Sequence, residues 1–81
     1  MKSVTIYTTP TCGFCHAAKD FMKEHGVSYI EHDVTEDEAA RDEMLALSGQ
    51  MGVPFIIVGE GDERVMITGF DQPKLSAALG L

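Results

Sequence analysis

The chain contains two cysteines, Cys12 and Cys15, and only Gly13 and Phe14 separate them. Side chains three positions apart on a helix lie about 5–6 Å apart between their Cβ atoms, so a disulfide can close there with little backbone movement. A disulfide across so short a loop stabilises a fold only weakly through chain entropy. The pair therefore favours a redox centre, in which the bond opens and closes, over a structural crosslink.

The position of the pair at the expected start of a helix assigns different roles to the two thiols. A thiolate, rather than a thiol, attacks a disulfide. Unpaired backbone N–H groups and the positive end of the helix dipole stabilise a thiolate at Cys12, whereas Cys15 lies one turn deeper and is expected to stay protonated longer. We expect Cys12 to form a mixed disulfide with the substrate and Cys15 to resolve it.

The same residues are also compatible with metal chemistry. The stretch from Cys12 to His16 matches C-x-x-C-H, the covalent haem attachment signature, in which His16 would be an axial ligand. Zinc held by the two cysteines and a distant pair such as His25 and His32 would lack the second clustered ligand pair of structural zinc sites. A protein that binds a metal, or an iron–sulfur cluster, through the same thiols is therefore the alternative to an oxidoreductase.

Composition and charge limit the other function classes. The 81 residues, of which 44% are apolar and 23% charged, suit one globular domain over residues 1–81. No apolar run approaches the roughly 20 residues of a membrane span, and the first residues show no signal peptide. A net charge of −7 argues against nucleic acid and anionic membranes as partners. We expect a cytoplasmic monomer that binds neither nucleic acid nor membranes.

The elements that must position the cysteine pair begin with a strand and a helix. Residues 2–8 alternate apolar and polar side chains, as in a strand with one buried face. Thr11 is the predicted N-cap of a helix that Gly26 ends. Apolar residues recur at helical spacing between these two positions, and Lys19 is expected on the solvent side. The cysteines are therefore expected in the first turn of this helix.

Further elements follow in an order that predicts the fold class. A second strand, residues 28–34, precedes a capping box of Thr35 and Glu38, which starts a second helix. Residues 54–58 form a nearly continuous apolar strand, residues 64–68 complete a hairpin with it, and a last helix follows. The order βαβαββα predicts an α/β fold with helices on both faces of a small sheet, in which each early strand–helix–strand unit crosses over right-handed.

Two short motifs after the cysteines are candidate binding elements. Pro54 opens an apolar strand, where a proline is otherwise disfavoured. A cis bond after Val53 would leave the backbone groups of Val53 free to pair with an extended peptide, although spacing alone leaves a trans proline equally open. Gly69-Phe70-Asp71 lies at the start of the last helix, either as a binding site for a carboxylate or as a plain turn in which Asp71 is the N-cap.

Together, these motifs resemble a glutaredoxin. The resemblance is carried in order by residues 7–16, 48–54 and 68–71 and covers essentially the whole chain. It implies a thioredoxin-like fold with a four-stranded mixed sheet flanked by three helices, a cis proline facing the active site, and dithiol–disulfide exchange. The implied catalytic residues are Cys12 and Cys15. The implied substrate-binding residues are Phe14, Val53, Pro54, Gly69, Phe70 and Asp71.

Within that family, the chain is most similar to small YruB-type glutaredoxin-like proteins and to the redoxins that reduce ribonucleotide reductase. Many glutaredoxins bind glutathione through a lysine, a Gly-Gly pair and two acidic residues. At the corresponding places this chain has Thr9, Thr68-Gly69 and Asp71-Gln72. The resemblance implies disulfide-containing client proteins as partners and no bound cofactor. Glutathione and thioredoxin reductase are the candidate electron donors, and we expect the second to work at least as well as the first.

The Cys-Gly-Phe opening of the motif also resembles the monothiol class of the family, which holds a bridging iron–sulfur cluster. That class has a serine where this chain has Cys15. Cluster binding is therefore a minor hypothesis beside dithiol exchange.

Overall fold

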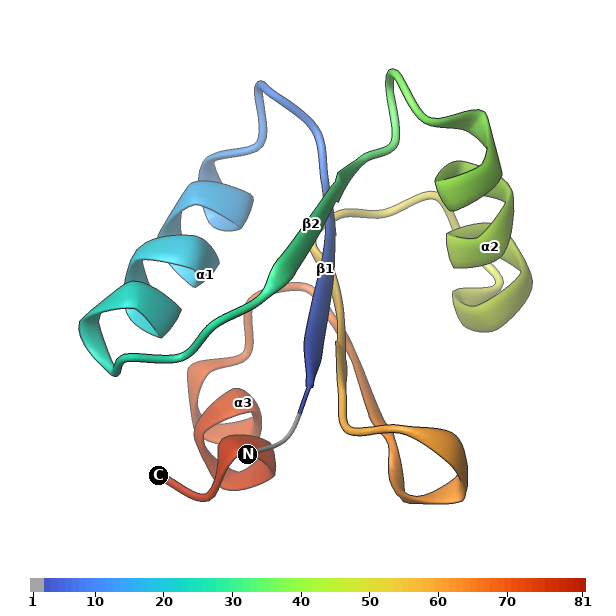
Figure 1. Cartoon of the computed structure of the whole chain (residues 1–81). Coiled ribbons are helices and arrows are strands. Elements are labelled where there is room, and N and C mark those ends of the chain that lie inside the picture. Colours follow the sequence, from blue (N-terminus) through green and yellow to red (C-terminus); the bar gives the residue numbers. More distant parts are fainter. Residues whose placement is uncertain (1–2) are drawn as a thin grey trace.

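Strand β1 (Val4–Thr8) lies inside a four-stranded sheet whose strand order is β2-β1-β3-β4. This arrangement is seen in a computed structural model that describes residues 3–81, so Lys2, the predicted first residue of the strand, lies outside the described residues. The remaining elements are α1 (Gly13–Glu24), β2 (Ile30–Asp33), α2 (Glu38–Ser48), β3 (Phe55–Val58), the short 3-10 helix Gly61–Glu63, β4 (Val65–Thr68) and α3 (Gln72–Leu79). The predicted order and the four-stranded mixed sheet with three helices are confirmed (Figure 1).

The pairing register brings the predicted motifs to one edge of the sheet. Thr8 at the end of β1 pairs with Asp33 at the end of the parallel strand β2. Tyr7 pairs with Phe55, the first residue of the antiparallel strand β3, and Phe55 pairs in turn with Thr68, the last residue of β4. The loops after β1 and β4 and the loop before β3 therefore leave the sheet at the same edge (Figure 1).

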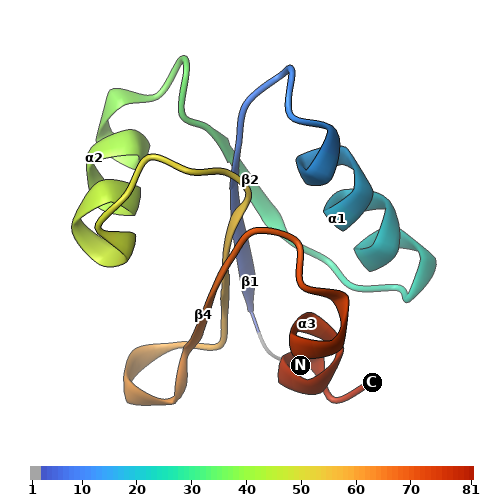
Figure 2. The ribbon, with the colours of Figure 1, turned by 180° about the vertical axis from the view of Figure 1, so that it is seen from behind.

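The expectation of a second parallel crossover is wrong. The first unit, β1–α1–β2, forms the expected parallel pair, but β3 runs antiparallel to β1. After α2, residues 49–54 run back to the edge from which α2 started, so β3 begins there rather than at the opposite edge (Figures 1 and 2). This return places Pro54 beside the end of β1.

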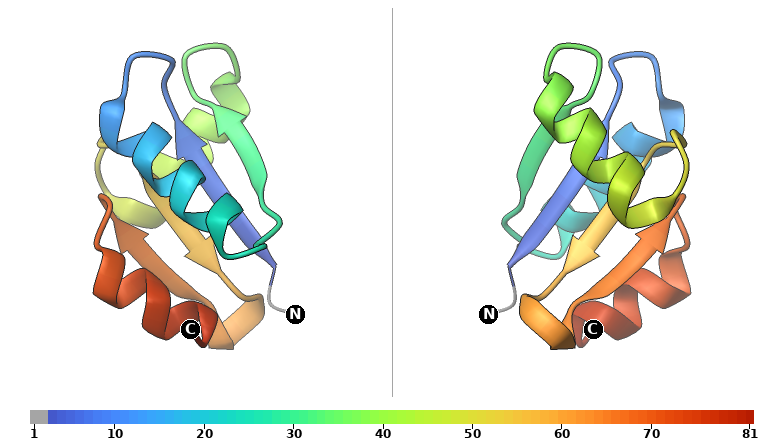
Figure 3. Two further views of the ribbon diagram at one scale, coloured as in Figure 1. Left: turned by 90° about the vertical axis from the view of Figure 1, so that its left-hand side faces the viewer. Right: turned by 90° about the vertical axis from the view of Figure 1, so that its right-hand side faces the viewer.

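Two apolar cores lie on opposite faces of the sheet. The first core, between the sheet and helices α1 and α3, consists of Val4, Ile6, Ala18, Phe21, Met22, Ile56, Val58, Ile67, Leu75 and Ala78. The second core, between the sheet and α2, consists of Tyr7, Val34, Ala40, Met44 and Phe55. Strand alternation divides β1 and β3 between the two cores. Figure 3 shows α1 and α3 in front of the sheet in one view and α2 in front of it in the other.

The start of α2 differs from the prediction. Thr35 does not cap this helix, because its N–H and hydroxyl both donate to Oδ1 of Asp33 in a tight turn. Asp37 is the N-cap instead, and its Oδ1 accepts from the N–H of Ala40 at 3.0 Å. The polar groups of Thr35 are therefore used in the turn with Asp33 and not in capping α2.

No helix within residues 3–81 has both the length and the apolar character that crossing a bilayer requires.

Candidate active site

The first turn of α1 is built around the sulfur of Cys12. Cys12, rather than the predicted Thr11, is the N-cap of the helix, and its Sγ accepts a hydrogen bond from the N–H of Cys15 at 3.1 Å. The extended backbone of Cys12 (φ −84°, ψ 108°) is that of an N-cap residue, and it aims the sulfur at the free N–H groups of the first turn. A negative charge on this sulfur would lie at the positive end of the helix.

The two thiols differ in exposure. Cys12 is half-buried, whereas Cys15 is fully buried below it, and both are free thiols. Burial, together with the hydrogen bond to Cys12, raises the pKa of the Cys15 thiol to about 12. The raised pKa agrees with the expectation that Cys15 stays protonated, and the role of Cys12 as the sulfur that meets the substrate stays a prediction.

The loop before Cys12 is held in place by hydrogen bonds. The N–H of Cys12 donates to the carbonyl of Thr9 at 3.3 Å, which closes a turn over Pro10. The Nε2 atom of His16 lies 3.2 Å from the carbonyl oxygen of Pro10, so the first turn of α1 is tied to the same loop. This hydrogen bond fixes the His16 side chain against the loop before Cys12. Its place on the helix alone indicates only an exposed side chain.

The side chains between the cysteines lie in the open. Phe14 is 70% exposed, the largest value among the large apolar side chains that are exposed in the described part of the chain. A Cβ added to Gly13 would meet no atom within 4 Å, so the space beside the cysteine pair is free. An exposed aromatic ring beside an accessible sulfur suits contact with another molecule.

The Pro54 and Gly69 motifs are bonded to each other. The Val53–Pro54 peptide bond is cis, as the family resemblance implied. Pro54 is fully buried, Val53 packs on the second core, and the N–H of Gly69 donates to the carbonyl of Pro54 at 2.8 Å. Gly69 has a φ of +81°, a left-handed conformation that glycine adopts without strain. The two motifs therefore form one structural unit next to the end of β1.

The other two residues of the last motif have structural contacts of their own. Phe70 packs against the first core, and its ring centroid lies 5.9 Å from that of Phe21 on α1. Asp71 is exposed and is the N-cap of α3, because its Oδ1 accepts from the N–H of Lys74 at 3.2 Å. The predicted role of Asp71 as the N-cap of the last helix is therefore confirmed.

A polar network below the cysteines was missed by the sequence analysis. Lys19 does not simply face solvent, because its Nζ lies 2.9 Å from Oε2 of Glu31 on β2 and its side chain is 18% exposed. Thr8 donates from Oγ1 to the same oxygen at 2.8 Å. The only sequence signal was that Lys19 follows Cys15 by one helical turn. Its partner on β2 could not be identified without the strand register.

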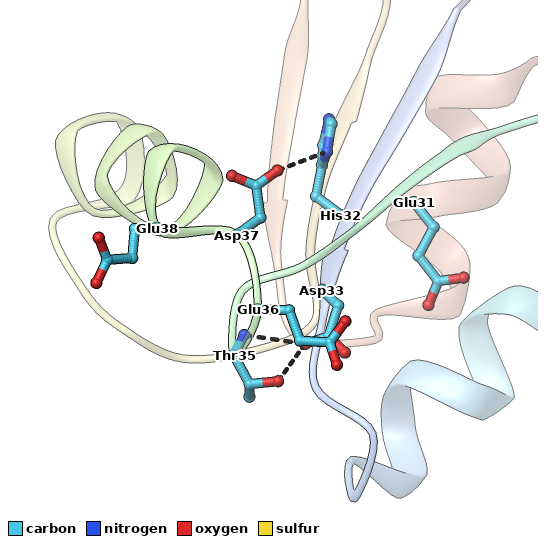
Figure 4. Close-up of a pocket in the computed structure, with 7 residues that line it drawn as sticks. All are labelled: Glu31, His32, Asp33, Thr35, Glu36, Asp37 and Glu38. Carbon is cyan, nitrogen blue, oxygen red and sulfur yellow. Dashed lines mark hydrogen bonds and ion pairs between the residues drawn. The ribbon is translucent and has the colours of Figure 1, made fainter.

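A polar depression beside α2 carries no comparable chemistry. Figure 4 shows its lining residues, Glu31, His32, Asp33, Thr35, Glu36, Asp37 and Glu38. Asp33 and Asp37 already accept hydrogen bonds that close the turn and cap α2, and Asp37 Oδ2 lies 3.9 Å from Nδ1 of His32. These carboxylates serve the local backbone.

The donors of the predicted zinc alternative do not come together. His25 is the C-cap of α1, at the opposite end of the helix from Cys12, and its ring contacts that of Phe21 in a tilted arrangement with centroids 4.5 Å apart. His32 contacts Tyr7 on the face covered by α2. Within residues 3–81, no three His, Cys, Asp or Glu side chains are arranged to hold a metal ion. The metal-binding alternative is not favoured.

Comparison with known proteins finds similar sequences over most of the chain. A family model described as glutaredoxin matches residues 4–62. A glutaredoxin-like 8.6 kDa protein from the rubredoxin operon of Clostridium pasteurianum is 35% identical over 72 residues, which cover 89% of this chain and 91% of that protein. Glutaredoxin 3 of Escherichia coli K12 is 41% identical over 58 residues, covering 72% of this chain and 70% of the relative.

Among solved structures, the chain is similar to NrdH-redoxin from Escherichia coli, which is described as a glutaredoxin-like protein with a thioredoxin-like activity profile. The TM-score is 0.76 at 29% identity, and the match covers 93% of this chain and 92% of that one. The fold of the chain is therefore similar to that of this small glutaredoxin-like protein over nearly the whole of both chains.

Proposed function

Because the chain belongs to the glutaredoxin family, we propose that it is a thiol–disulfide oxidoreductase that reduces disulfides of client proteins, or their mixed disulfides with glutathione, through Cys12 and Cys15. The observation that carries the proposal is the asymmetric cysteine pair. Cys12 is half-buried at the N-cap of α1 and accepts the N–H of Cys15, while Cys15 is buried one turn deeper.

In the first step, the thiolate of Cys12 attacks one sulfur of the substrate disulfide. A bond forms between Cys12 and that sulfur, the substrate disulfide breaks, and the other substrate sulfur leaves as a thiolate that takes a proton from water. The N–H of Cys15 and the dipole of α1 support the attacking anion before the reaction. The half-buried position of Cys12 lets a substrate sulfur approach it.

In the second step, Cys15 loses its proton and attacks the sulfur of Cys12. The Cys12–Cys15 disulfide forms, the mixed disulfide breaks, and the second substrate sulfur leaves as a thiolate. The substrate has then gained two electrons, and an external reductant must return the cysteines to thiols. Because the pKa of Cys15 is raised to about 12, this step depends on how its thiolate is stabilised.

The substrate is proposed to lie between the cysteine loop and the unit formed by the Pro54 and Gly69 motifs. The side chain of Val53 packs on the second core, which supports a role for its backbone, rather than its side chain, in pairing with an extended peptide. Phe14 would cover one side of the peptide, and Gly69, Phe70 and Asp71 would form the far wall.

For the electron donor, we propose that thioredoxin reductase serves at least as well as glutathione. Thr9, Thr68 and Gln72 replace groups with which many glutaredoxins hold glutathione. The thioredoxin-like activity profile of the Escherichia coli NrdH-redoxin supports the same choice. We also propose a cytoplasmic location, because a single close cysteine pair suits redox chemistry in a reducing compartment.

The test is turnover of insulin disulfides coupled to NADPH consumption, with either thioredoxin reductase or glutathione plus glutathione reductase. We expect activity with the first donor at least equal to that with the second, and none in Cys12→Ser. Full turnover by Cys12→Ser would refute the role of Cys12. Strong preference for glutathione would instead refute only the choice of donor.

A further inference from the structure

Lys19 lies on the same face of α1 as the buried thiol Cys15, one helical turn further along. Its side chain is 18% exposed, so most of its length packs against the protein and its ammonium is bonded to Glu31 at the surface rather than free in solvent. A lysine can pack its aliphatic chain along a helix while its ammonium reaches a polar partner. The partner of Lys19 is the carboxylate of Glu31, at 2.9 Å.

Glu31 is itself fixed by the sheet. Alternation along β2 places Glu31 on the α1 side and His32 on the α2 side, and Figure 4 shows the two side chains on opposite sides of the strand. Thr8 is 2% exposed and donates its hydroxyl to the same carboxylate oxygen that binds Lys19. The ammonium therefore has a defined position set by β1 and β2.

The groups around Cys15 act on its thiolate in opposite directions. Burial and the neighbouring Cys12 raise the pKa of Cys15, whereas the Thr9 backbone and Lys19 lower it. The hydrogen bond between Lys19 and Glu31 raises the pKa of the lysine and lowers that of the glutamate, so both remain charged near neutral pH. The remaining titratable groups that act on this pair are Tyr29 and Asp33.

We propose that Lys19 is a positioning residue for the resolving step: held by Glu31, its ammonium stabilises the thiolate of Cys15 while that sulfur attacks the mixed disulfide at Cys12. This inference rests on the proposed function and adds a residue to it. The proton of Cys15 passes to water, the Cys12–Cys15 bond forms, and the substrate sulfur leaves with the electron pair of the broken bond. Lys19 stays protonated throughout and exchanges no proton.

The two steps can be separated with the chromogenic disulfide dithiobis-nitrobenzoate. One equivalent added to the reduced protein releases a first nitrothiobenzoate when Cys12 forms the mixed disulfide and a second when Cys15 displaces the group from Cys12. Stopped-flow absorbance gives both rates, and Cys15→Ser identifies the second phase by losing it. Both rates are measured from about pH 6 to pH 9, below the ordinary pKa of lysine.

In Lys19→Met, we expect the second phase to slow and the first to stay within about twofold of wild type. If loss of the ammonium lowers the thiolate fraction of Cys15 about tenfold, the more basic thiolate gains about threefold in nucleophilicity, which leaves a net slowing of about threefold. The pH profile of the second phase should move to higher pH. Lys19→Arg, which keeps the charge, should restore most of the rate.

Lys23→Met is the matched control, because it removes one lysine from the exposed side of the same helix. It should leave both phases unchanged. Equal second-phase rates and pH profiles in Lys19→Met and wild type would overturn the inference, as would equal slowing of both phases or a slow second phase in Lys19→Arg. If wild type releases only one nitrothiobenzoate, the dithiol mechanism itself fails, and the inference fails with it.

Discussion

The N–H of Cys15 donates to the sulfur of Cys12 across 3.1 Å, so one atom is both the candidate nucleophile and the N-cap of α1. Capping and the proposed catalytic role therefore coincide at Cys12, and a substitution there removes both unless the new side chain can accept the hydrogen bond and keep the cap. Serine can accept it, whereas alanine cannot.

We expect Cys12→Ser and Cys12→Ala to lose disulfide exchange equally but to differ in stability. The serine variant should be more stable than the alanine variant by about 0.5–2 kcal/mol, because the hydroxyl caps the helix. Urea unfolding in the presence of a reductant measures the difference. Equal unfolding free energies of the two variants would show that the sulfur contributes nothing as a cap.

Alkylation should distinguish the two thiols in the folded protein. At about pH 8, iodoacetamide is expected to modify Cys12 at least about tenfold faster than Cys15, because Cys15 is buried and its pKa is raised to about 12. Mass spectrometry of the digested protein gives the extent at each cysteine. Unfolding in urea should remove the difference, and comparable rates in the folded state would contradict the burial of Cys15.

The raised pKa of Cys15 predicts a loss of stability in alkali. Above the ordinary value of 9.0 the unfolded chain releases this proton while the folded chain keeps it, so the unfolded state binds fewer protons. The contribution is complete below about pH 9 and is lost as the pH rises towards about 12. The pKa of Tyr7, raised by burial and by its bond to Glu43, acts in the same direction above its ordinary value of 10.0.

Unfolding free energies at about pH 7.5 and pH 10, measured with a reductant present, test this dependence. Cys15→Ala removes one titrating group and should show a smaller decrease between the two pH values than wild type. The comparison of decreases is independent of any change in stability that the substitution itself causes. An identical decrease in both proteins would exclude Cys15 as a source.

Two isoleucines provide a matched test of the core. Ile56 is 0% exposed in the first core, whereas Ile30 on the edge strand β2 is 59% exposed. We expect Ile56→Ala to lower the free energy of unfolding by about 2–5 kcal/mol and Ile30→Ala to change it by less than about 0.5 kcal/mol. Denaturant titration followed by circular dichroism measures both, and similar losses would contradict the placement of β2.

Asp71 has an observed capping role and a proposed binding role, and two substitutions separate them. Asp71→Ala should lower stability by about 0.5–2 kcal/mol, and Asp71→Ser should restore most of it, since serine also caps helices. If the carboxylate contacts substrate, Asp71→Ser should still lower kcat/KM for a client disulfide, by about two- to fivefold for one exposed charge. Wild-type kcat/KM in Asp71→Ser would leave the cap as its only role.

The order of elements could be predicted from the sequence because each element depends on local patterns. Each of these patterns spans only a few residues. Examples are the alternation before Thr8, the apolar run after Pro54 and the N-cap Asp71 before α3. The N-caps of α1 and α2 were harder to predict, because neighbouring polar side chains compete for the cap position. Thr11 and Thr35 are good caps by residue type, but Cys12 and Asp37 occupy the positions.

The contacts between distant segments could not be predicted in the same way. The direction of β3 depends on the path of residues 49–54, and a parallel crossover would satisfy the apolar pattern equally well. The bond between Gly69 and Pro54 and the bond between Lys19 and Glu31 follow only once the strand register is known. The local half of the candidate site was therefore predictable, and the half made by tertiary contacts was not.

The sulfurs and the amide that supports them come from one short stretch of chain, whereas the Pro54 and Gly69 motifs, which are hydrogen-bonded to each other, come much later in the sequence. Under the proposed function, the reacting sulfurs are thus encoded apart from most of the binding residues, of which only Phe14 lies in the same stretch. On that proposal, changes in the later stretches should alter which clients bind while Cys12 and Cys15 are left intact.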